Sequence, residues 1–175
     1  MSWQLRRAGL ADLDAIMALE ESSFETDAWS RESMQREIES PLCYYLVGFD
    51  AETGAAAETA GNGDIDGYAG LLCPRGASDA DIQTIAVSER SRGRGLGRQL
   101  MGRLLAEATD RGARSIFLEV RADNPVAQSL YRSLGFEEIA VRPNYYQPDG
   151  VDAVVMRAPL PPRVASLAAD DGGER

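Results

Sequence analysis

The chain has 175 residues, of which 44% are hydrophobic, so it can bury the core of one domain but is short for two. We expect a single domain over residues 1–160, followed by a polar tail, residues 161–175, that is disordered. The formal net charge of −10 argues against extended contact with nucleic acid, which depends on many cationic side chains meeting phosphates. There is no histidine and all 18 basic residues are arginine, so a general base has to be a carboxylate, a tyrosine, a cysteine or a chain terminus.

Membrane, secreted and metal-binding classes are also not expected. No segment reaches the roughly eighteen consecutive apolar residues of a membrane span, and residues 1–14 lack the apolar stretch of a secretion signal. Cys43 and Cys73 are far apart in the chain and have no partner cluster, which argues against a metal site and a disulfide framework. We therefore expect a cytoplasmic protein with no metal and no membrane partner.

The N-terminal segment predicts one strand and two helices. Residues 3–9 are expected to form a short strand, and residues 10–24 a helix with its apolar residues near one face. A second short helix is expected to begin after Ser30, a favourable N-cap, and to end before Pro41.

Two apolar segments then predict adjacent antiparallel strands, residues 43–49 and residues 65–73. The stretch between them, residues 50–64, is rich in alanine, glycine and acidic residues. We expect it to be an exposed loop that is longer than a hairpin needs.

A strand–loop–helix–strand unit follows. Residues 81–87 and residues 115–120 read as strands, and the long helix between them makes them parallel neighbours. Asn124 is expected to cap a further helix that stops at Gly135. The chain then closes with a hairpin whose turn contains Pro148-Asp149-Gly150.

The segment "SRGRGLGRQL", residues 91–100, lies where the loop of this unit becomes the helix. Glycines let backbone N–H groups turn toward a ligand, and the first turn of a helix leaves those groups unpaired, so the junction favours an anion such as a phosphate. The segment lacks the lysine of a nucleoside-triphosphate loop and the glycine spacing of a dinucleotide fingerprint.

It does fit the pattern Arg/Gln-x-x-Gly-x-Gly/Ala and resembles the pyrophosphate-binding signature of the GCN5-related N-acetyltransferases, the GNAT family. The resemblance runs from about residue 3 to residue 156 and includes "TIAV" and "FLEVRADNPVAQSLYRSLGF". It implies an α/β (α+β) GNAT fold, with a mixed, mostly antiparallel sheet of about seven strands flanked by about four helices. The fourth and fifth strands would splay apart.

The resemblance also implies acetyl-CoA as the cosubstrate, held between the splayed strands. The backbone of the fourth strand would bind the acetyl and pantetheine amides, and the glycine loop would bind the pyrophosphate. The matching cofactor-binding residues are Ile85, Ala86, Val87, Arg92, Gly93, Arg94, Gly95, Leu96, Gly97, Arg98 and Asn124. An ordinary buried strand remains the alternative for the "TIAV" side chains, and a helix cap would equally explain Asn124.

Two residues match the family's catalytic groups. Glu119 is a charge within an otherwise apolar strand and matches the general base; the alternative is a salt bridge to Arg121 or a side chain in solvent. Tyr131 matches the tyrosine that protonates the departing thiolate, although an aromatic residue at this spacing is more often part of a core.

Three aromatic residues match the substrate side. Tyr145 and Tyr146 lie in the final hairpin, which in the N-terminal acetyltransferase branch covers the substrate peptide, and Trp29 resembles an aromatic residue between the first two helices. Exposed tyrosines without a role and a packing tryptophan are the alternatives.

The segments look most like family members that acetylate the N-terminal alanine of a small-subunit ribosomal protein, and an acidic chain suits a basic partner. A small amine acceptor such as a polyamine or an antibiotic, a broader range of peptide N-termini, and a coenzyme A-binding module without catalysis stay open as alternatives.

Overall fold

The structure is a computed structural model that describes residues 2–53 and 64–162. Its helices and strands follow in the order β1 (Trp3–Arg7), η1 (Leu10–Asp12), α1 (Leu13–Ser23), α2 (Arg31–Glu39), β2 (Cys43–Asp50), β3 (Gly67–Leu72), β4 (Asp79–Val87), η3 (Glu89–Ser91), α3 (Leu96–Asp110), β5 (Ser115–Arg121), α4 (Pro125–Ser133), β6 (Glu137–Tyr146) and β7 (Val151–Pro159). Most of the expected residues 50–64 loop and of the C-terminal tail lies outside the described residues.

The described strands form one seven-stranded sheet in the order β1-β2-β3-β4-β5-β7-β6. The pair β2 and β3 is antiparallel, and β4 and β5 are parallel, as the sequence predicts. Every other neighbouring pair is antiparallel, so the predicted mixed sheet and the fold class are confirmed.

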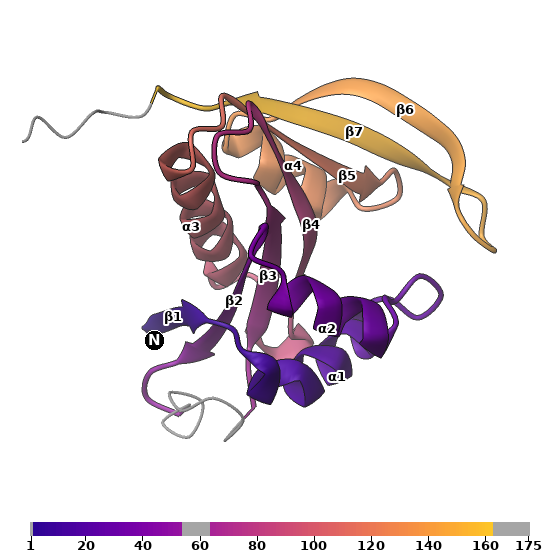
Figure 1. Cartoon of the computed structure of the whole chain (residues 1–175). Helices are drawn as coiled ribbons and strands as arrows, with labels where there is room; N and C mark the ends of the chain where they lie inside the picture. Colours follow the sequence, from indigo (N-terminus) through magenta and orange to yellow (C-terminus); the bar gives the residue numbers. More distant parts are fainter. Residues whose placement is uncertain (1, 54–63, 163–175) are drawn as a thin grey trace, which may run out of the picture.

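Helices cover both faces of the sheet (Figure 1). The helix α3 packs on β2, β3 and β4 from one side, where its leucines join the larger hydrophobic cluster with β5 and α4. The helices α1 and α2 pack on the other side and share a second cluster with β2, β3 and β4. The apolar stripe of each helix is therefore buried against a sheet that is apolar on both faces.

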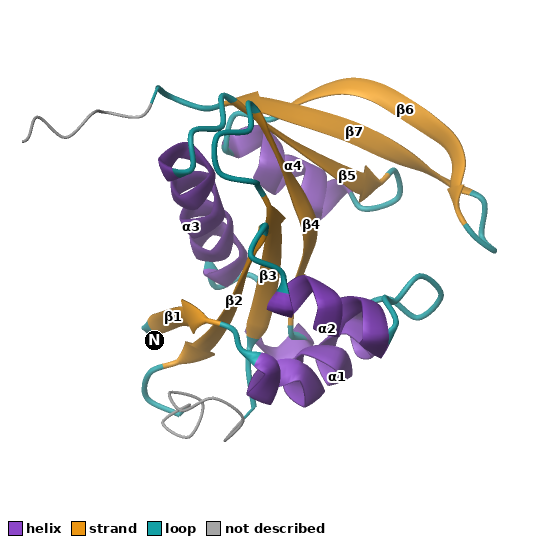
Figure 2. Ribbon diagram, in the orientation of Figure 1, coloured by secondary structure: helices purple, strands orange, loops and turns teal. Residues whose placement is uncertain are grey.

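The strands β4 and β5 pair only at their beginnings. Their register links Asp79 with Ser115 and Asp81 with Phe117, and no later residues pair. Beyond this point β5 stays bonded to β7, and the β6–β7 hairpin extends past the end of β5 (Figure 2). The divergence opens a space beside the second half of β4.

A β-bulge interrupts β4 at Gln83. Gly70 of β3 pairs with Thr84 and Leu71 pairs with Ile82, so Gln83 has no residue opposite it on β3. Because one extra residue turns the following side chains to the opposite face, Ile82 packs with the α3 cluster, whereas Ala86 packs with the α1 cluster.

Two predicted boundaries differ from the structure. The expected helix over residues 10–24 begins as the 3₁₀ turn η1, because the buried Asp12 carboxylate accepts the Gly9 N–H and binds Arg6. The first strand of the hairpin, expected to end at Arg142, runs on to Tyr146 in β6, since Tyr146 pairs with Val151 after an irregularity in which Asn144 has a left-handed φ of 52°.

We predict that Gly70→Ala destabilises the fold by about 1–3 kcal/mol, because it overpacks a filled site. A Cβ at Gly70 would lie 2.3 Å from Cζ of Tyr45, and the hydroxyl of that ring donates a 2.9 Å hydrogen bond to Gln83. Urea unfolding measures the change. The control is Gly102→Ala in α3, where a Cβ meets nothing within 4 Å; it should stabilise by about 0.5–1 kcal/mol. Equal effects at the two positions would refute the packing argument.

Candidate active site

A cleft of about 720 Å³ opens where β4 and β5 diverge. Its walls come from β4 and β5, from α1 and the loop that follows it, from α4, and from the end of β6. Seven of the residues singled out from the sequence line it: Trp29, Ile85, Glu119, Asn124, Tyr131, Tyr145 and Tyr146. The fold thus brings together side chains that are more than a hundred residues apart in the chain.

Glu119 faces the cleft from β5, in the alternation that buries Leu118 and Val120 on the other side. Its Oε1 lies 3.1 Å from Nε of Arg142, which reaches over from β6. The expected alternative of a salt bridge to Arg121 is wrong, because Arg121 binds Asp123 and Asp149, each at 3.0 Å. The ion pair with Arg142 holds the Glu119 carboxylate at the cleft wall.

Tyr131 is 7% exposed and belongs to the larger hydrophobic cluster, as its packing alternative expects, and it also lines the cleft. Its hydroxyl has no hydrogen-bond partner among the described residues. Because every fully buried side-chain oxygen of these residues does have a partner, the Tyr131 hydroxyl is not fully buried and is open to the cleft. Burial raises the pKa of Tyr131 to about 12. The group therefore stays protonated near neutral pH and can donate a proton.

Tyr145 and Tyr146 end β6 with their rings edge to face, 5.1 Å apart. The hydrogen bond from the Tyr145 hydroxyl to Glu119 raises the pKa of Tyr145. Burial raises the pKa of Tyr146 to about 12, and the Arg121 guanidinium lies 5.1 Å over its ring. Tyr145 is nevertheless 46% exposed, so this end of the cleft is open to a ligand.

Arg121 joins three segments around the mouth of the cleft. It binds Asp123 after β5 and Asp149 in the β6–β7 turn, and it lies 4.0 Å from Asp27 in the loop after α1. The hydrogen bonds with Asp123 and Asp149 raise the pKa of Arg121. This residue fixes where the hairpin lies relative to the loop that carries Trp29.

The glycine loop lies beyond the cleft, at the carboxyl end of β4. Gly93 and Gly95 have positive φ values of 74° and 85°, and a Cβ at either position would meet nothing within 4 Å. Gly95 is the N-cap of α3, and no side chain caps it. Leu96 is buried in the core, and the N–H groups of the first turn of α3 point out of its N-terminal end, where the helix offers them no carbonyl partner. Ala86, Val87 and residues 92–98 do not line the cleft.

Asn124 caps α4 as expected, since its Oδ1 accepts the Ala127 N–H at 3.1 Å, and it also lines the cleft. Trp29 is partly buried against the α1 cluster and lines the cleft as well. For both residues, the structural role and the position in the site hold together.

Glu20, which was not predicted as a site residue from the sequence, lines the cleft from α1 and is 1% exposed. The signal was available, because Glu20 follows Leu13, Ile16 and Met17 at the spacing of their buried stripe. A charge at such a position needs partners.

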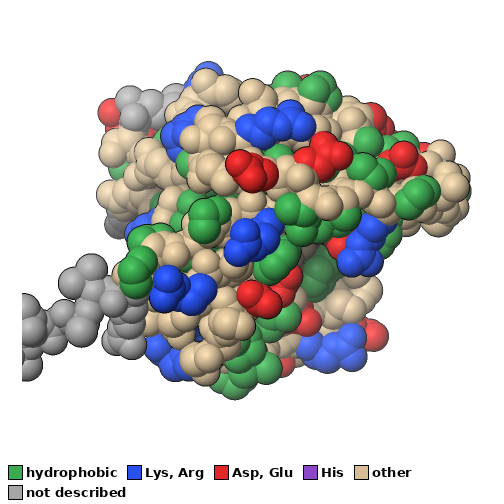
Figure 3. All heavy atoms as spheres, turned by 90° about the horizontal axis from the view of Figure 1, so that it is seen from above, with side chains coloured by type: hydrophobic (Ala, Val, Ile, Leu, Met, Phe, Trp, Pro, Cys, Tyr) green, Lys and Arg blue, Asp and Glu red, His purple; other side chains and the backbone are tan. Residues whose placement is uncertain are grey.

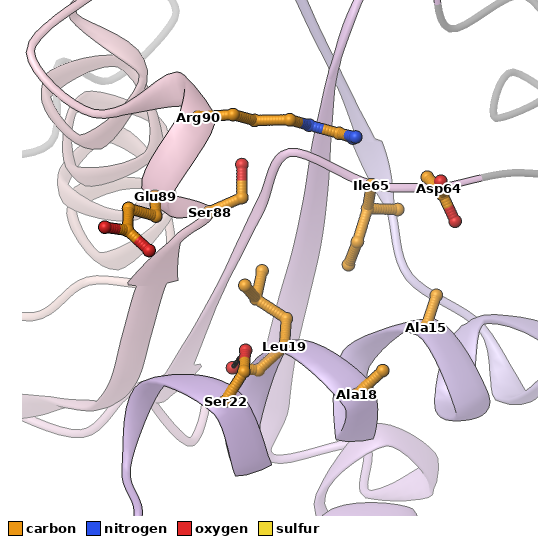
Figure 4. Close-up of a pocket in the computed structure, with 9 residues that line it drawn as sticks. All are labelled: Ala15, Ala18, Leu19, Ser22, Asp64, Ile65, Ser88, Glu89 and Arg90. Atoms are coloured by element: carbon orange, nitrogen blue, oxygen red, sulfur yellow. Dashed lines mark hydrogen bonds between the residues drawn. The ribbon is translucent and has the colours of Figure 1, made fainter.

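A second hollow, of about 640 Å³, lies between α1, the segment that leads into β3 and the segment that follows β4 (Figure 4). Its floor is small and apolar, with Ala15, Ala18 and Leu19 facing Ile65, and it contains none of the predicted site residues. In the part of the chain that the structure describes, no three acidic or cysteine side chains gather as a metal site would require.

The surface charges are mixed. In the view from above, arginines and acidic side chains lie between hydrophobic ones without forming one basic surface (Figure 3). Over residues 2–53 and 64–162, no helix is long and apolar enough to cross a membrane.

This chain is similar to known acetyltransferases in both sequence and structure. The family model described as Acetyltransferase (GNAT) family matches residues 13–136. The N-alpha-acetyltransferase RimI of Mycobacterium tuberculosis is 37% identical over 150 residues, covering 84% of this chain and 86% of the relative. The chain spans only 38% of the length of an uncharacterised Mycobacterium leprae protein that is 39% identical over 150 residues, 84% of this chain.

The [ribosomal protein bS18]-alanine N-acetyltransferase of Escherichia coli is 44% identical over 84 residues, which cover 47% of this chain and 57% of that protein. The crystal structure of the ribosomal-protein-alanine N-acetyltransferase from Escherichia coli matches with a TM-score of 0.76 at 27% identity. That alignment covers 95% of this chain and 98% of the crystallised one.

Proposed function

The chain belongs to the acetyltransferase (GNAT) family, whose members use acetyl-CoA, and we propose that it acetylates the α-amine of the N-terminal alanine of ribosomal protein bS18 in the cytoplasm. The observation that carries the proposal is the cleft between β4 and β5, which brings together the Glu119 carboxylate, the protonated Tyr131 and the adjacent pair Tyr145 and Tyr146. Residues 1–160 would act as one catalytic domain.

Glu119 would act as the general base. An α-amino group has a pKa of about 7.7–8.0 and must lose its proton before it can attack a thioester. Glu119 has 29% of its side chain exposed, at the wall of the cleft, so it can take this proton directly or through a water molecule. Arg142 would keep the carboxylate oriented toward the acceptor.

Tyr131 would act as the general acid from α4. Its hydroxyl is protonated and open to the cleft, and it would give its proton to the sulfur that leaves when the amide forms. Backbone N–H groups of β4 near the bulge at Gln83 would stabilise the negative charge on the acetyl oxygen. Cys43 and Cys73 are both buried and do not line the cleft, so transfer is direct and needs no acyl-enzyme.

The residues present fit acetyl-CoA. The glycine loop offers outward N–H groups at a helix N-terminus with open space at Gly93 and Gly95, as a pyrophosphate requires. The diverging strands leave the backbone around Ile85 without a partner on β5, so it can bind the amides of the pantetheine arm. When bound, acetyl-CoA supplies the activated acetyl group.

The peptide would enter beside Trp29, Tyr145 and Tyr146, which are among the aromatic residues that line the cleft. A net charge of −10 favours the approach of a basic ribosomal polypeptide. The name of the Mycobacterium tuberculosis relative refers to N-alpha-acetylation without one substrate, so a broader range of peptide N-termini is the second candidate.

The test is acetyl-CoA turnover, followed by thiol release and peptide mass, with hexapeptides that begin Ala-Arg, Met-Ala or Ser-Arg and with spermidine. We expect acetylation of the Ala-Arg peptide on its α-amine to be the fastest. Similar rates for all three peptides would favour the broader enzyme, and acetylation of spermidine alone would replace the acceptor class. Tight binding of acetyl-CoA without any turnover would refute catalysis.

A further inference from the structure

Glu20 is a buried carboxylate that has no role in the mechanism proposed above. It occupies the apolar stripe of α1, is 1% exposed, and lines the cleft. Burying an ionised carboxylate is costly unless a charge or several hydrogen bonds compensate it. The partners of Glu20 therefore indicate what the group is for.

Both hydrogen bonds that the Glu20 carboxylate accepts within the described residues come from neutral donors. The backbone N–H of Trp29 donates to Oε1 at 3.0 Å, and the Thr84 hydroxyl donates to Oε2 at 3.4 Å. The bulge at Gln83 turns Thr84 toward α1, and the hydroxyl of Tyr68 lies 3.1 Å from that of Thr84. Burial raises the pKa of Glu20, and these two hydrogen bonds oppose the shift.

No arginine of the described chain pairs with Glu20. Both arginines of the cleft are engaged elsewhere, Arg142 with Glu119 and Arg121 with Asp123 and Asp149. The charge that acts on the pKa of Glu20 is that of Asp27, which has the same sign and raises it. A glutamine at this position could accept the hydrogen bond from the backbone N–H of Trp29 equally well, so this bond does not require a charge. The negative charge of Glu20 is therefore available to a cation from outside the chain.

We propose that Glu20 binds the ammonium form of the substrate's α-amine in the cleft, before Glu119 removes a proton from it. This inference rests on the proposed function, which brings an ammonium group to this cleft. Thr84, the hydrogen-bond partner of Glu20, directly precedes Ile85, so the ammonium would lie beside the strand proposed to hold the acetyl group. The ring of Trp29 adds an aromatic surface that favours a cation.

The experiment compares two peptide ligands that differ only in whether they carry the α-ammonium group. One is the Ala-Arg hexapeptide, and the other is the same peptide with a propionyl group in place of its alanine, which lacks the amine. Binding of each to the full chain saturated with coenzyme A is measured by calorimetry. We expect the unaltered chain to prefer the ammonium peptide about tenfold to a hundredfold, as hydrogen bonds to a charged group allow.

In Glu20→Gln this preference should fall to less than about twofold, while the affinity for coenzyme A stays unchanged. Glu21→Gln is the matched control, because Glu21 is the next residue of α1 and is exposed, so the same charge change there should leave the preference intact. Glu20→Asp retains the charge and should keep most of the preference, which separates the charge from any loss of stability in the glutamine variant.

A preference that persists in Glu20→Gln, or that falls equally in Glu21→Gln, would overturn the inference while leaving the acetyltransferase proposal intact. If the unaltered chain neither binds nor acetylates the Ala-Arg peptide, the proposed acceptor fails and the inference fails with it. The acetylation rate of the unaltered chain distinguishes these two results.

Discussion

Glu119→Gln is expected to lower kcat about 10²- to 10⁴-fold at neutral pH, the usual contribution of a general base. Glutamine keeps the shape of the side chain but cannot take the proton of the α-amine. The affinity for acetyl-CoA should stay nearly unchanged, because Glu119 lies in the cleft and not at the glycine loop. Steady-state turnover and coenzyme A binding measure the two effects separately.

The matched control is Glu137→Gln at the start of β6, which removes one carboxylate from an exposed position outside the cleft. It should leave kcat unchanged. Equal turnover of Glu119→Gln and the unaltered chain would rule out Glu119 as the base. In that case its contacts with Arg142 and Tyr145 would only hold the hairpin in place.

Tyr131→Phe is expected to lower kcat about 10- to 10²-fold, less than the loss of the base, since a thiolate leaves readily even without a proton. The free energy of unfolding should change by less than about 1 kcal/mol, because the lost hydroxyl has no partner among the described residues. The ring contact with Phe136, at 6.0 Å between centroids, is retained. Turnover and urea unfolding of the same preparation provide both numbers.

A loss of several kcal/mol of stability in Tyr131→Phe would instead support a packing role for the residue. Tyr131→Ala is a poor probe of catalysis, because removing the buried ring itself costs about 3–5 kcal/mol. The raised pKa of Tyr131, about 12, adds a pH expectation: ionisation of this hydroxyl should not reduce turnover on the alkaline side of neutrality. A fall in the rate of the unaltered chain that Tyr131→Phe abolishes would contradict it.

Local sequence signals predicted much of the fold. The caps at Ser30 and Asn124 accept the expected backbone N–H groups, since a cap depends on residues three positions apart. The parallel pairing of β4 with β5 follows from the helix that connects them. The glycine loop was evident for the same reason, because the φ angles of Gly93 and Gly95 are local properties.

The partners of charged groups could not be predicted in this way. Glu119 and Arg121 are neighbours on one face of β5, which made their salt bridge a reasonable expectation. In the structure Glu119 pairs with Arg142 across β7, and Arg121 pairs with Asp149 of the β6–β7 turn, because the β6–β7 hairpin continues the sheet beside β5. Which partner a long side chain binds depends on the distances that the strand order and the register set.

The sequence by itself determined the order of the elements, the family resemblance and the residues suited to acid–base work, since each depends on spacing along the chain. Only the tertiary structure decided that these residues share one cleft and that Glu20 faces it. The physical reason is the bulge at Gln83 and the early divergence of β4 from β5. The extra residue of the bulge changes the direction of the side chains that follow it, and the short β4–β5 pairing leaves open the space that the substrate would use.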